Sequence, residues 1–171
     1  MNKGFIQVYT GNGKGKTTAA LGLALRAVCA GKKVYIGQFV KSMKYNEAKA
    51  GKYLPGFEIE QYGKGCFINR DPSKEDIKAA EEGIDKIEKI LKEGKYDIVI
   101  LDEINIAIYY NLLSPSKVIE VIDNKKENTE IILTGRYAHD MIINRADLVT
   151  EMKEIKHYFN NGIKARDGIE R

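Results

Sequence analysis

Short apolar runs recur along this chain, and between them lie segments in which apolar residues return every three or four positions. The short runs have the length and the β-branched and aromatic content of strands. They predict strands at residues 5–9, 34–40, 57–62, 97–101, 131–133 and 148–155. The periodic segments predict helices at residues 19–30, 73–92, 114–123 and 139–144.

The longest periodic segment is amphipathic, because Ile77, Ile84 and Leu91 fall on one face among many charged residues. Ser73 and Asp76 at its start resemble an N-cap pair. Strands that alternate with helices favour an α/β fold, a mainly parallel sheet with helices on both faces. Ligands of such sheets bind at the carboxyl ends of the strands.

Length and composition narrow the class of protein. With 171 residues, 43% of them hydrophobic and 30% charged, the chain is expected to form a single domain over residues 1–171. The net charge of +4 is spread along the chain, which gives little support for nucleic acid but suits anionic small molecules. No apolar run approaches the ~20 residues of a membrane span, and no signal peptide is visible. We therefore expect a cytoplasmic protein without membrane or nucleic-acid partners.

The strongest chemical signal is a glycine-rich segment between the first strand and the first helix. It reads Thr10-Gly11-Asn12-Gly13-Lys14-Gly15-Lys16-Thr17-Thr18. In this context the pattern predicts a triphosphate-binding loop whose backbone N–H groups, together with the helix N-terminus, point at the phosphates. Lys16 is then expected to contact phosphate oxygens and Thr17 to ligate Mg²⁺. The alternative is a glycine-rich turn that binds nothing, and Thr10 stands where the usual pattern has glycine.

Charged residues follow two further predicted strands. Asp102 and Glu103 end the run at 97–101, where either carboxylate can serve Mg²⁺ directly or through water. Arg136 follows the run at 131–133 and is expected to clamp phosphate from the same edge. The alternatives are a solvated acidic strand end and a surface arginine. Arg26, on the first helix, is by itself better explained as a solvent-facing or packing residue.

Two other segments are candidates for a ligand site. Residues 62–70 combine glycines with Phe67 and basic side chains, which is typical of a mobile loop for a large flat substrate. The alternative is a connection that packs on the core. The tail at 157–171 is less polar than a disordered end, so it folds over a site or docks for stability. His139 and His157 have no metal-ligand spacing and are interpreted as structural.

Several motifs are absent from the sequence. The base-reading motif of GTPases is missing, as are an Asp-x-x-Gly after the phosphate loop, the arginine-rich lid of small kinases and a base placed to activate water or a hydroxyl. The chain thus has groups for a triphosphate and magnesium but no machinery for phosphoryl transfer. A reaction in which the triphosphate leaves as a whole fits this combination.

Taken together, these residues resemble the ATP:corrinoid adenosyltransferases of vitamin B12 biosynthesis. The resemblance is carried by residues 9–20, by Ala24-Leu25-Arg26-Ala27, by Leu101-Asp102-Glu103, by Leu133-Thr134-Gly135-Arg136 and by residues 162–170. It implies a RecA-like phosphate-loop fold and the substrates ATP and a reduced corrinoid. In that family the corrinoid loop carries an aromatic pair that includes Trp, whereas this chain has no Trp and offers Gly65-Cys66-Phe67-Ile68.

The resemblance also implies a chemistry. Cobalt(I) of the corrinoid attacks the 5′ carbon of ATP, a cobalt–carbon bond forms and triphosphate leaves. Residues 11–18 then hold the phosphates of an ATP that lies reversed in the loop. Arg26 and Glu103 lie at the nucleotide and its Mg²⁺, Arg136 is an active-site arginine, and Phe67 faces the corrinoid. A homodimer and an electron-donor flavoprotein are further expectations. The remaining alternatives are a small nucleotide or metabolite kinase and a nucleotide-gated binding protein.

Overall fold

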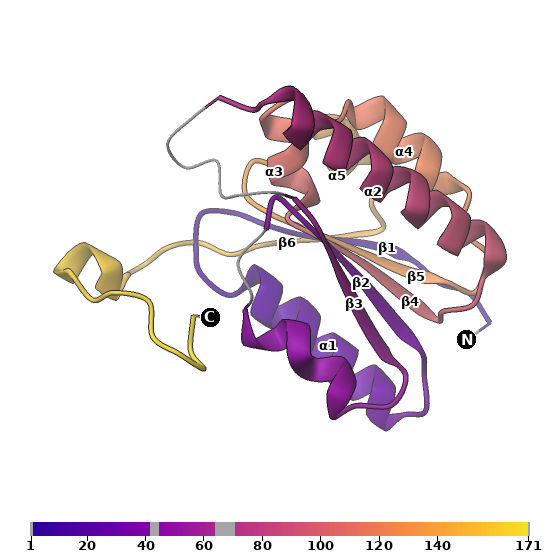
Figure 1. Cartoon of the computed structure of the whole chain (residues 1–171), viewed down its shortest axis with the longest axis horizontal. Helices are drawn as coiled ribbons and strands as arrows, with labels where there is room; N and C mark the ends of the chain where they lie inside the picture. The colour runs from indigo at the N-terminus through magenta and orange to yellow at the C-terminus, as the bar shows by residue number, and fades with distance from the viewer. Residues whose placement is uncertain (1, 42–44, 64–70, 171) are drawn as a thin grey trace.

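The computed structural model describes residues 2–41, 45–63 and 71–170 (Figure 1). Within them, six strands form one sheet in the order β3-β2-β4-β5-β1-β6, and every pairing is parallel. The strands are β1 (Ile6–Thr10), β2 (Val34–Phe39), β3 (Phe57–Tyr62), β4 (Ile98–Asp102), β5 (Glu130–Thr134) and β6 (Leu148–Glu151). The predicted α/β class with a parallel sheet is confirmed.

Helices cover both faces of the sheet. One face carries α1 (Lys16–Cys29) and the short 3₁₀ helix η1 (Asn46–Lys52). The other face carries α2 (Lys74–Glu93), α3 (Ile104–Tyr109), α4 (Pro115–Asp123) and α5 (Asp140–Arg145), as Figure 1 shows. A second 3₁₀ helix, η3 (Tyr158–Asn161), lies in the C-terminal tail. Among the described residues, no helix is long and apolar enough to cross a membrane.

The core lies in two layers, one on each side of the sheet. Small side chains of α1 (Ala20, Ala24 and Ala27) pack on one face. Ile87 and Leu91 of α2 pack on the other face with α4. Every residue of β4 and β5 is buried, which is typical of parallel strands covered by helices on both sides. The layers hold the carboxyl ends of β1, β2, β4 and β5 at one edge.

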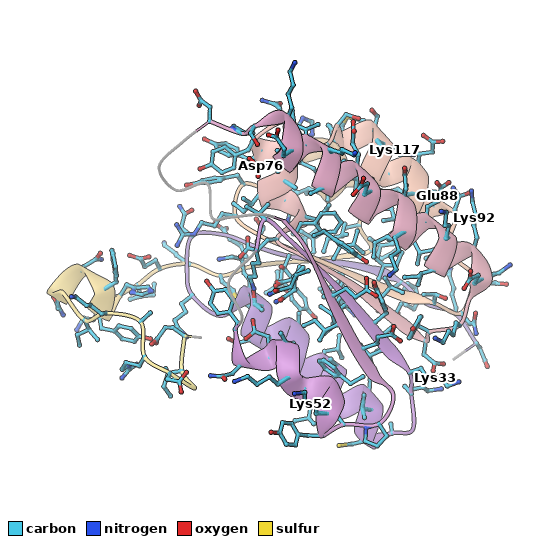
Figure 2. All side chains as sticks on the ribbon, viewed as in Figure 1. Lys33, Lys52, Asp76, Glu88, Lys92 and Lys117 are labelled. Atoms are coloured by element: carbon cyan, nitrogen blue, oxygen red, sulfur yellow. The ribbon has the colours of Figure 1, made fainter. Side chains whose placement is uncertain are left out.

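Helix α2 begins with the predicted cap. The Ser73 hydroxyl accepts from the Asp76 N–H at 3.3 Å, and Asp76 accepts from the Ser73 N–H at 2.9 Å, so Asp fills the place usual for Glu. Its outer face is charged: Figure 2 shows Glu88 near Lys92 of the same helix and Lys117 of α4. These exposed pairs add little stability but keep the helix face polar.

Two predicted boundaries were wrong, and one helix was missed. Helix α1 begins at Lys16 rather than Ala19, because the chain turns helical directly after Gly15. Strand β6 ends at Glu151, so the strand predicted to Ile155 is half as long and lies exposed at the sheet edge. Helix α3 was not predicted, because its six residues continue the apolar run of β4 and are too few to show a helical period.

Candidate active site

The glycine-rich segment joins β1 to α1 at the carboxyl edge of the sheet. Gly11 and Gly15 have positive φ values of 91° and 118°, which favour glycine. A Cβ on Gly13 would lie 2.7 Å from the Met152 carbonyl oxygen, so the loop also needs glycine to pack against the chain after β6. The Gly13 N–H donates to that carbonyl at 2.6 Å. The Gly13 N–H is therefore paired with protein, whereas the glycine pattern predicted that the backbone N–H groups of this loop point at the phosphates.

Lys16 begins α1 and is folded across the loop. Its ammonium donates to the carbonyl oxygens of Gly11 at 2.8 Å and Gly13 at 2.6 Å, and only 7% of the residue is exposed. Burial, followed by the positive charge of Arg136, lowers the pKa of the Lys16 ammonium below its ordinary value. The loop carbonyls thus hold the lysine in position.

Asp102 is a buried hub beneath the loop, with 1% of its surface exposed. One carboxylate oxygen accepts from the hydroxyls of Thr17 at 2.8 Å and Thr134 at 2.7 Å. The other accepts from Lys41 at 2.6 Å and Gln38 at 3.0 Å. Burial alone would raise the pKa of Asp102, but the Lys41 ammonium and these hydrogen bonds outweigh it and hold the pKa low. Asp102 is therefore a carboxylate that orients four donors.

Glu103 lies next to this hub but faces the cavity. Its φ of 59° is left-handed, which is uncommon for a non-glycine residue and turns the chain from β4 into α3. Its N–H donates to the Thr134 hydroxyl at 2.9 Å. Burial, and then the negative charge of Asp102, raise the pKa of the Glu103 carboxyl. The pKa values of these two neighbouring acids at the end of β4 are thus shifted in opposite directions.

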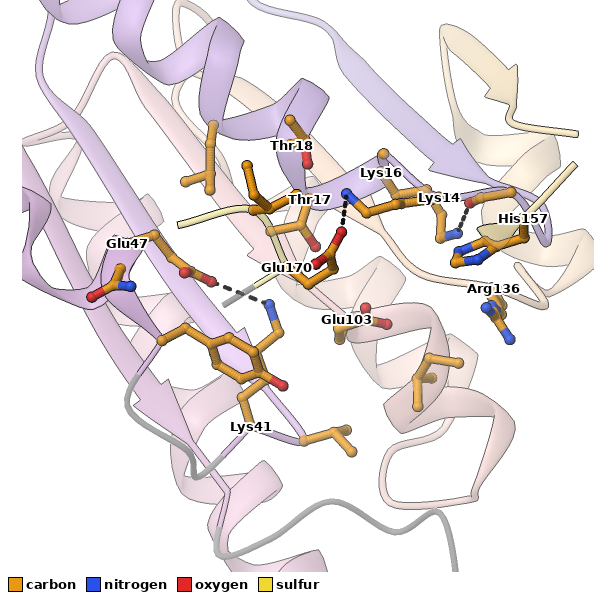
Figure 3. A pocket seen from close by; sticks show the side chains of 18 of the residues that line it. Lys14, Lys16, Thr17, Thr18, Lys41, Glu47, Glu103, Arg136, His157 and Glu170 are labelled. Atoms are coloured by element: carbon orange, nitrogen blue, oxygen red, sulfur yellow. Dashed lines mark hydrogen bonds and ion pairs between the residues drawn. The ribbon is translucent and has the colours of Figure 1, made fainter. Parts of the chain in front are cut away.

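A cavity of about 820 Å³ opens above these residues (Figure 3). The phosphate loop from Gly13 to Thr18 lines one wall, and Glu103 and Arg136 line another. Asn105 of α3 donates to the Gly135 carbonyl at 3.3 Å and so fixes the turn before Arg136. A volume of this size lies in the usual range for small-molecule sites.

Other predicted site residues lie at the margin of this cavity or outside it. Asp102 is buried below its floor, and Gly11 and Asn12 belong to the loop without lining the cavity. Arg26 is exposed in the last turn of α1 and is not brought to the cavity wall. Phe67 lies outside the described residues.

The C-terminal tail returns to the phosphate loop. Gly168, Ile169 and Glu170 line the cavity, and the Glu170 carboxylate is 3.9 Å from the Lys14 ammonium. Glu170 also accepts from Tyr158 and Arg166, which lower its pKa to about 2. The tail therefore folds over the site, one of the two outcomes expected for it. His157, interpreted from sequence as structural, also lines the cavity.

Sequence reasoning missed two groups of residues at the cavity. The first is Lys41, which follows β2, and Glu47 of η1, and neither belongs to a recognisable motif. The second is a set of partly or largely exposed tyrosines in and beside the lining, Tyr109, Tyr110 and Tyr137. The rings of Tyr109 and Tyr137 are 4.3 Å apart between centroids, and Tyr110 and Tyr137 line the cavity. In the sequence, only the position of Tyr137 directly after Arg136, near the end of a predicted strand, could have indicated that Tyr137 lines the site.

Known proteins resemble this chain over nearly its whole length. Residues 2–171 match the family described as ATP:corrinoid adenosyltransferase BtuR/CobO/CobP. The chain is 36% identical over 168 residues to the corrinoid adenosyltransferase of Escherichia coli K12, covering 98% of this chain and 86% of that protein. It is 37% identical over 172 residues to a Sinorhizobium corrinoid adenosyltransferase, covering 98% and 80%. Corrinoid adenosyltransferase CobA of Salmonella typhimurium is 35% identical over 168 residues, covering 98% and 86%. The chain, matched over residues 2–171 and 35–37% identical to these enzymes, belongs to the ATP:corrinoid adenosyltransferase family.

Proposed function

We propose that this protein transfers the 5′-deoxyadenosyl group of ATP to cobalt(I) of a reduced corrinoid and releases triphosphate, in the synthesis or salvage of adenosylcobalamin. The observation that carries the proposal is that Lys16 and Thr17 line the same cavity as Glu103 and Arg136. Cobalt(I) is itself the nucleophile, so the protein has to position the 5′ carbon and stabilise charge on the leaving triphosphate.

The chain's residues divide this work between them. The loop residues Gly11, Asn12, Gly13, Lys14, Gly15 and Thr18 surround the phosphates. Lys16 and Arg136 contribute positive charge to the triphosphate as it leaves. The Lys16 ammonium is already held at the loop carbonyls, so it exchanges those contacts for phosphate oxygens without a large movement. Arg26 remains a proposal for the nucleotide from the family resemblance alone.

Magnesium, when bound, would supply charge neutralisation to the triphosphate. The donor set fits it in part: Thr17 and Glu103 present oxygen atoms at the cavity, which hard cations prefer. In the part of the chain that the structure describes, no cluster of three or more His, Cys, Asp or Glu residues forms a complete metal cage. Asp102 already accepts four hydrogen bonds, so we assign it to orienting the Thr17 hydroxyl rather than to direct coordination.

Glu103→Gln should raise the Mg²⁺ concentration needed for half-maximal rate, because it keeps the shape of the side chain and removes its charge. We expect a rise of about tenfold, equivalent to one charged interaction. The measurement is a magnesium titration of adenosylation at saturating ATP. Asp123→Asn removes the charge of an acid that does not line the cavity and serves as the control. An unchanged titration for Glu103→Gln would remove Glu103 from the magnesium site.

Phe67→Ala should weaken corrinoid binding while leaving ATP binding nearly intact. The corrin is large and partly apolar, so it needs an apolar wall that ATP does not need. Phe67 is the aromatic residue that the family resemblance places in this role. Separate titrations with ATP and with corrinoid, alongside a melting curve, test it. An equal loss of both affinities with a lower melting temperature would show that Phe67 is a packing residue.

The function itself is tested by mixing the protein with chemically reduced corrinoid, ATP and Mg²⁺. A light-sensitive cobalt–carbon product and inorganic triphosphate are the expected outcome. Release of ADP with a phosphorylated acceptor would favour the kinase alternative instead. Nucleotide-dependent partner binding without turnover would favour a binding protein.

The setting of the enzyme follows from the family resemblance. We propose a cytoplasmic homodimer that receives electrons for cobalt from a flavoprotein. Light scattering coupled to size exclusion measures the assembly, and reduction of cob(II) species by a purified flavodoxin-type donor measures the electron transfer. A monomer at micromolar concentration would contradict the proposed dimer.

A further inference from the structure

Lys41 lines the cavity but is not among the site residues predicted from the sequence. Its ammonium is 2.6 Å from Asp102 and 3.7 Å from Glu47, and 15% of its side chain is exposed. It lines the same cavity as the phosphate loop. Figure 3 draws its contact with Glu47 as a dashed line across the cavity wall.

The backbone before Lys41 is held in an unfavourable conformation. Val40 follows β2 with a φ of 62°, and a β-branched residue is a genuine outlier in the left-handed region. Its N–H is bonded to the Tyr62 carbonyl at 3.3 Å, which anchors the turn to β3. Strained residues of this kind persist where the surrounding structure fixes them, and they gather at functional sites. Here the strained turn directs Lys41 from the end of β2 toward the cavity.

The basic side chains around the cavity are held by different kinds of partner. Four of the described residues that line it carry Lys or Arg side chains: Lys14, Lys16, Lys41 and Arg136. The loop carbonyls hold Lys16, whereas carboxylates hold Lys41. Asp102 keeps three neutral donors, Thr17, Thr134 and Gln38, when Lys41 moves away. Glu47 also accepts from Gln38, at 3.2 Å. Both acids therefore retain hydrogen bonds without the ammonium.

We propose that Lys41 is a second triphosphate-binding lysine, which exchanges Asp102 and Glu47 for the phosphates when ATP binds. The proposal rests on the proposed function, because it takes the triphosphate as the group bound in this cavity. An ammonium on a flexible stem can exchange carboxylate for phosphate oxygens, and the negative charge of the triphosphate offsets the loss of the buried pair with Asp102. Lys16 then contacts the triphosphate from the start of α1, and Lys41 contacts it from the chain that follows β2.

The test uses inorganic triphosphate with Mg²⁺ as the probe, measured by isothermal titration, so that it does not depend on corrinoid or on turnover. Lys41→Gln should weaken binding by about 10- to 100-fold, the usual worth of a charge-assisted hydrogen bond. Lys92→Gln changes the net charge equally at the exposed end of α2 and should leave binding unchanged. Unaltered or tighter binding by Lys41→Gln would overturn the proposal.

A second variant distinguishes phosphate binding by Lys41 from its role as the counter-charge of Asp102. In Lys41→Gln/Asp102→Asn, two neutral amides face each other, so no buried charge lacks a partner. The reference for the double variant is Asp102→Asn, because that change by itself also disturbs the Thr17 hydroxyl. If Lys41 serves only to neutralise Asp102, the double variant should bind triphosphate as well as Asp102→Asn does, and the proposal fails. If Lys41 contacts the phosphates, the double variant should bind about 10- to 100-fold more weakly than Asp102→Asn. Triphosphate binding without adenosylation in the wild-type protein would instead contradict the proposed function and leave this role of Lys41 standing.

Discussion

Lys16→Ala should reduce the rate of adenosylation by on the order of 10²-fold or more, the usual effect of deleting a donor that stabilises developing charge. The loss is expected in turnover, because the ammonium stabilises the triphosphate as it leaves. It should also weaken ATP binding. Steady-state kinetics with reduced corrinoid, together with an ATP titration, separate these two effects.

A neighbouring lysine provides the control for Lys16. Lys14 belongs to the same loop, but it is exposed and pairs with Glu170 at 3.9 Å. Lys14→Ala should therefore have a smaller effect than Lys16→Ala. Turnover near that of the wild type for Lys16→Ala would show that the glycine-rich segment is a turn without a phosphate site.

Asp102→Asn should lower the stability of the protein by about 3 kcal/mol, because it leaves the Lys41 ammonium without its buried counter-charge. For a chain of this length, that loss corresponds to a fall in melting temperature of roughly 6–12 °C. Activity should fall as well, since the amide orients the Thr17 hydroxyl less well than the carboxylate. Thermal unfolding measures the first effect. Asp123→Asn breaks an exposed pair with Arg145 and should cost less than about 1 kcal/mol.

The same carboxylate gives the stability a dependence on pH. Because the pKa of Asp102 is lower in the folded protein than in the unfolded chain, its contribution is fully present above the unfolded pKa of about 4. It is lost as the pH falls from there through the folded pKa. The wild type should therefore lose part of its advantage over Asp102→Asn in acid. A constant difference in unfolding free energy between pH 7 and pH 3 would contradict this account of Asp102.

The parts of the site that sequence could predict are those that local pattern specifies. The glycine spacing before Lys16 and Thr17 sits between one strand and one helix, so its place at the sheet edge follows from neighbouring residues alone. Glu103 and Arg136 were predicted because each directly follows an apolar strand. In a parallel sheet all such positions lie at one edge.

The parts that sequence could not predict depend on register between distant strands. Gln38 contacts Asp102 because β2 pairs with β4 so that these two residues are partners. Lys41 reaches the same carboxylate through the unusual turn at Val40, which no local pattern indicates. The tail returns to the loop through Glu170, a contact that spans nearly the whole chain. Such contacts are set by tertiary packing.

The strand order has a consequence for how the protein is made. β1, which leads into the phosphate loop, lies between β5 and β6, the last two strands along the chain. In a nascent chain β1 therefore emerges from the ribosome well before its neighbours, which are complete only when residues 130–151 have been synthesised. Until then β1 exposes unpaired edges, which favour aggregation and recognition by chaperones. A product that stops before β5 leaves β1 unpaired, so the loop after β1 is held in place only in chains that extend past β5.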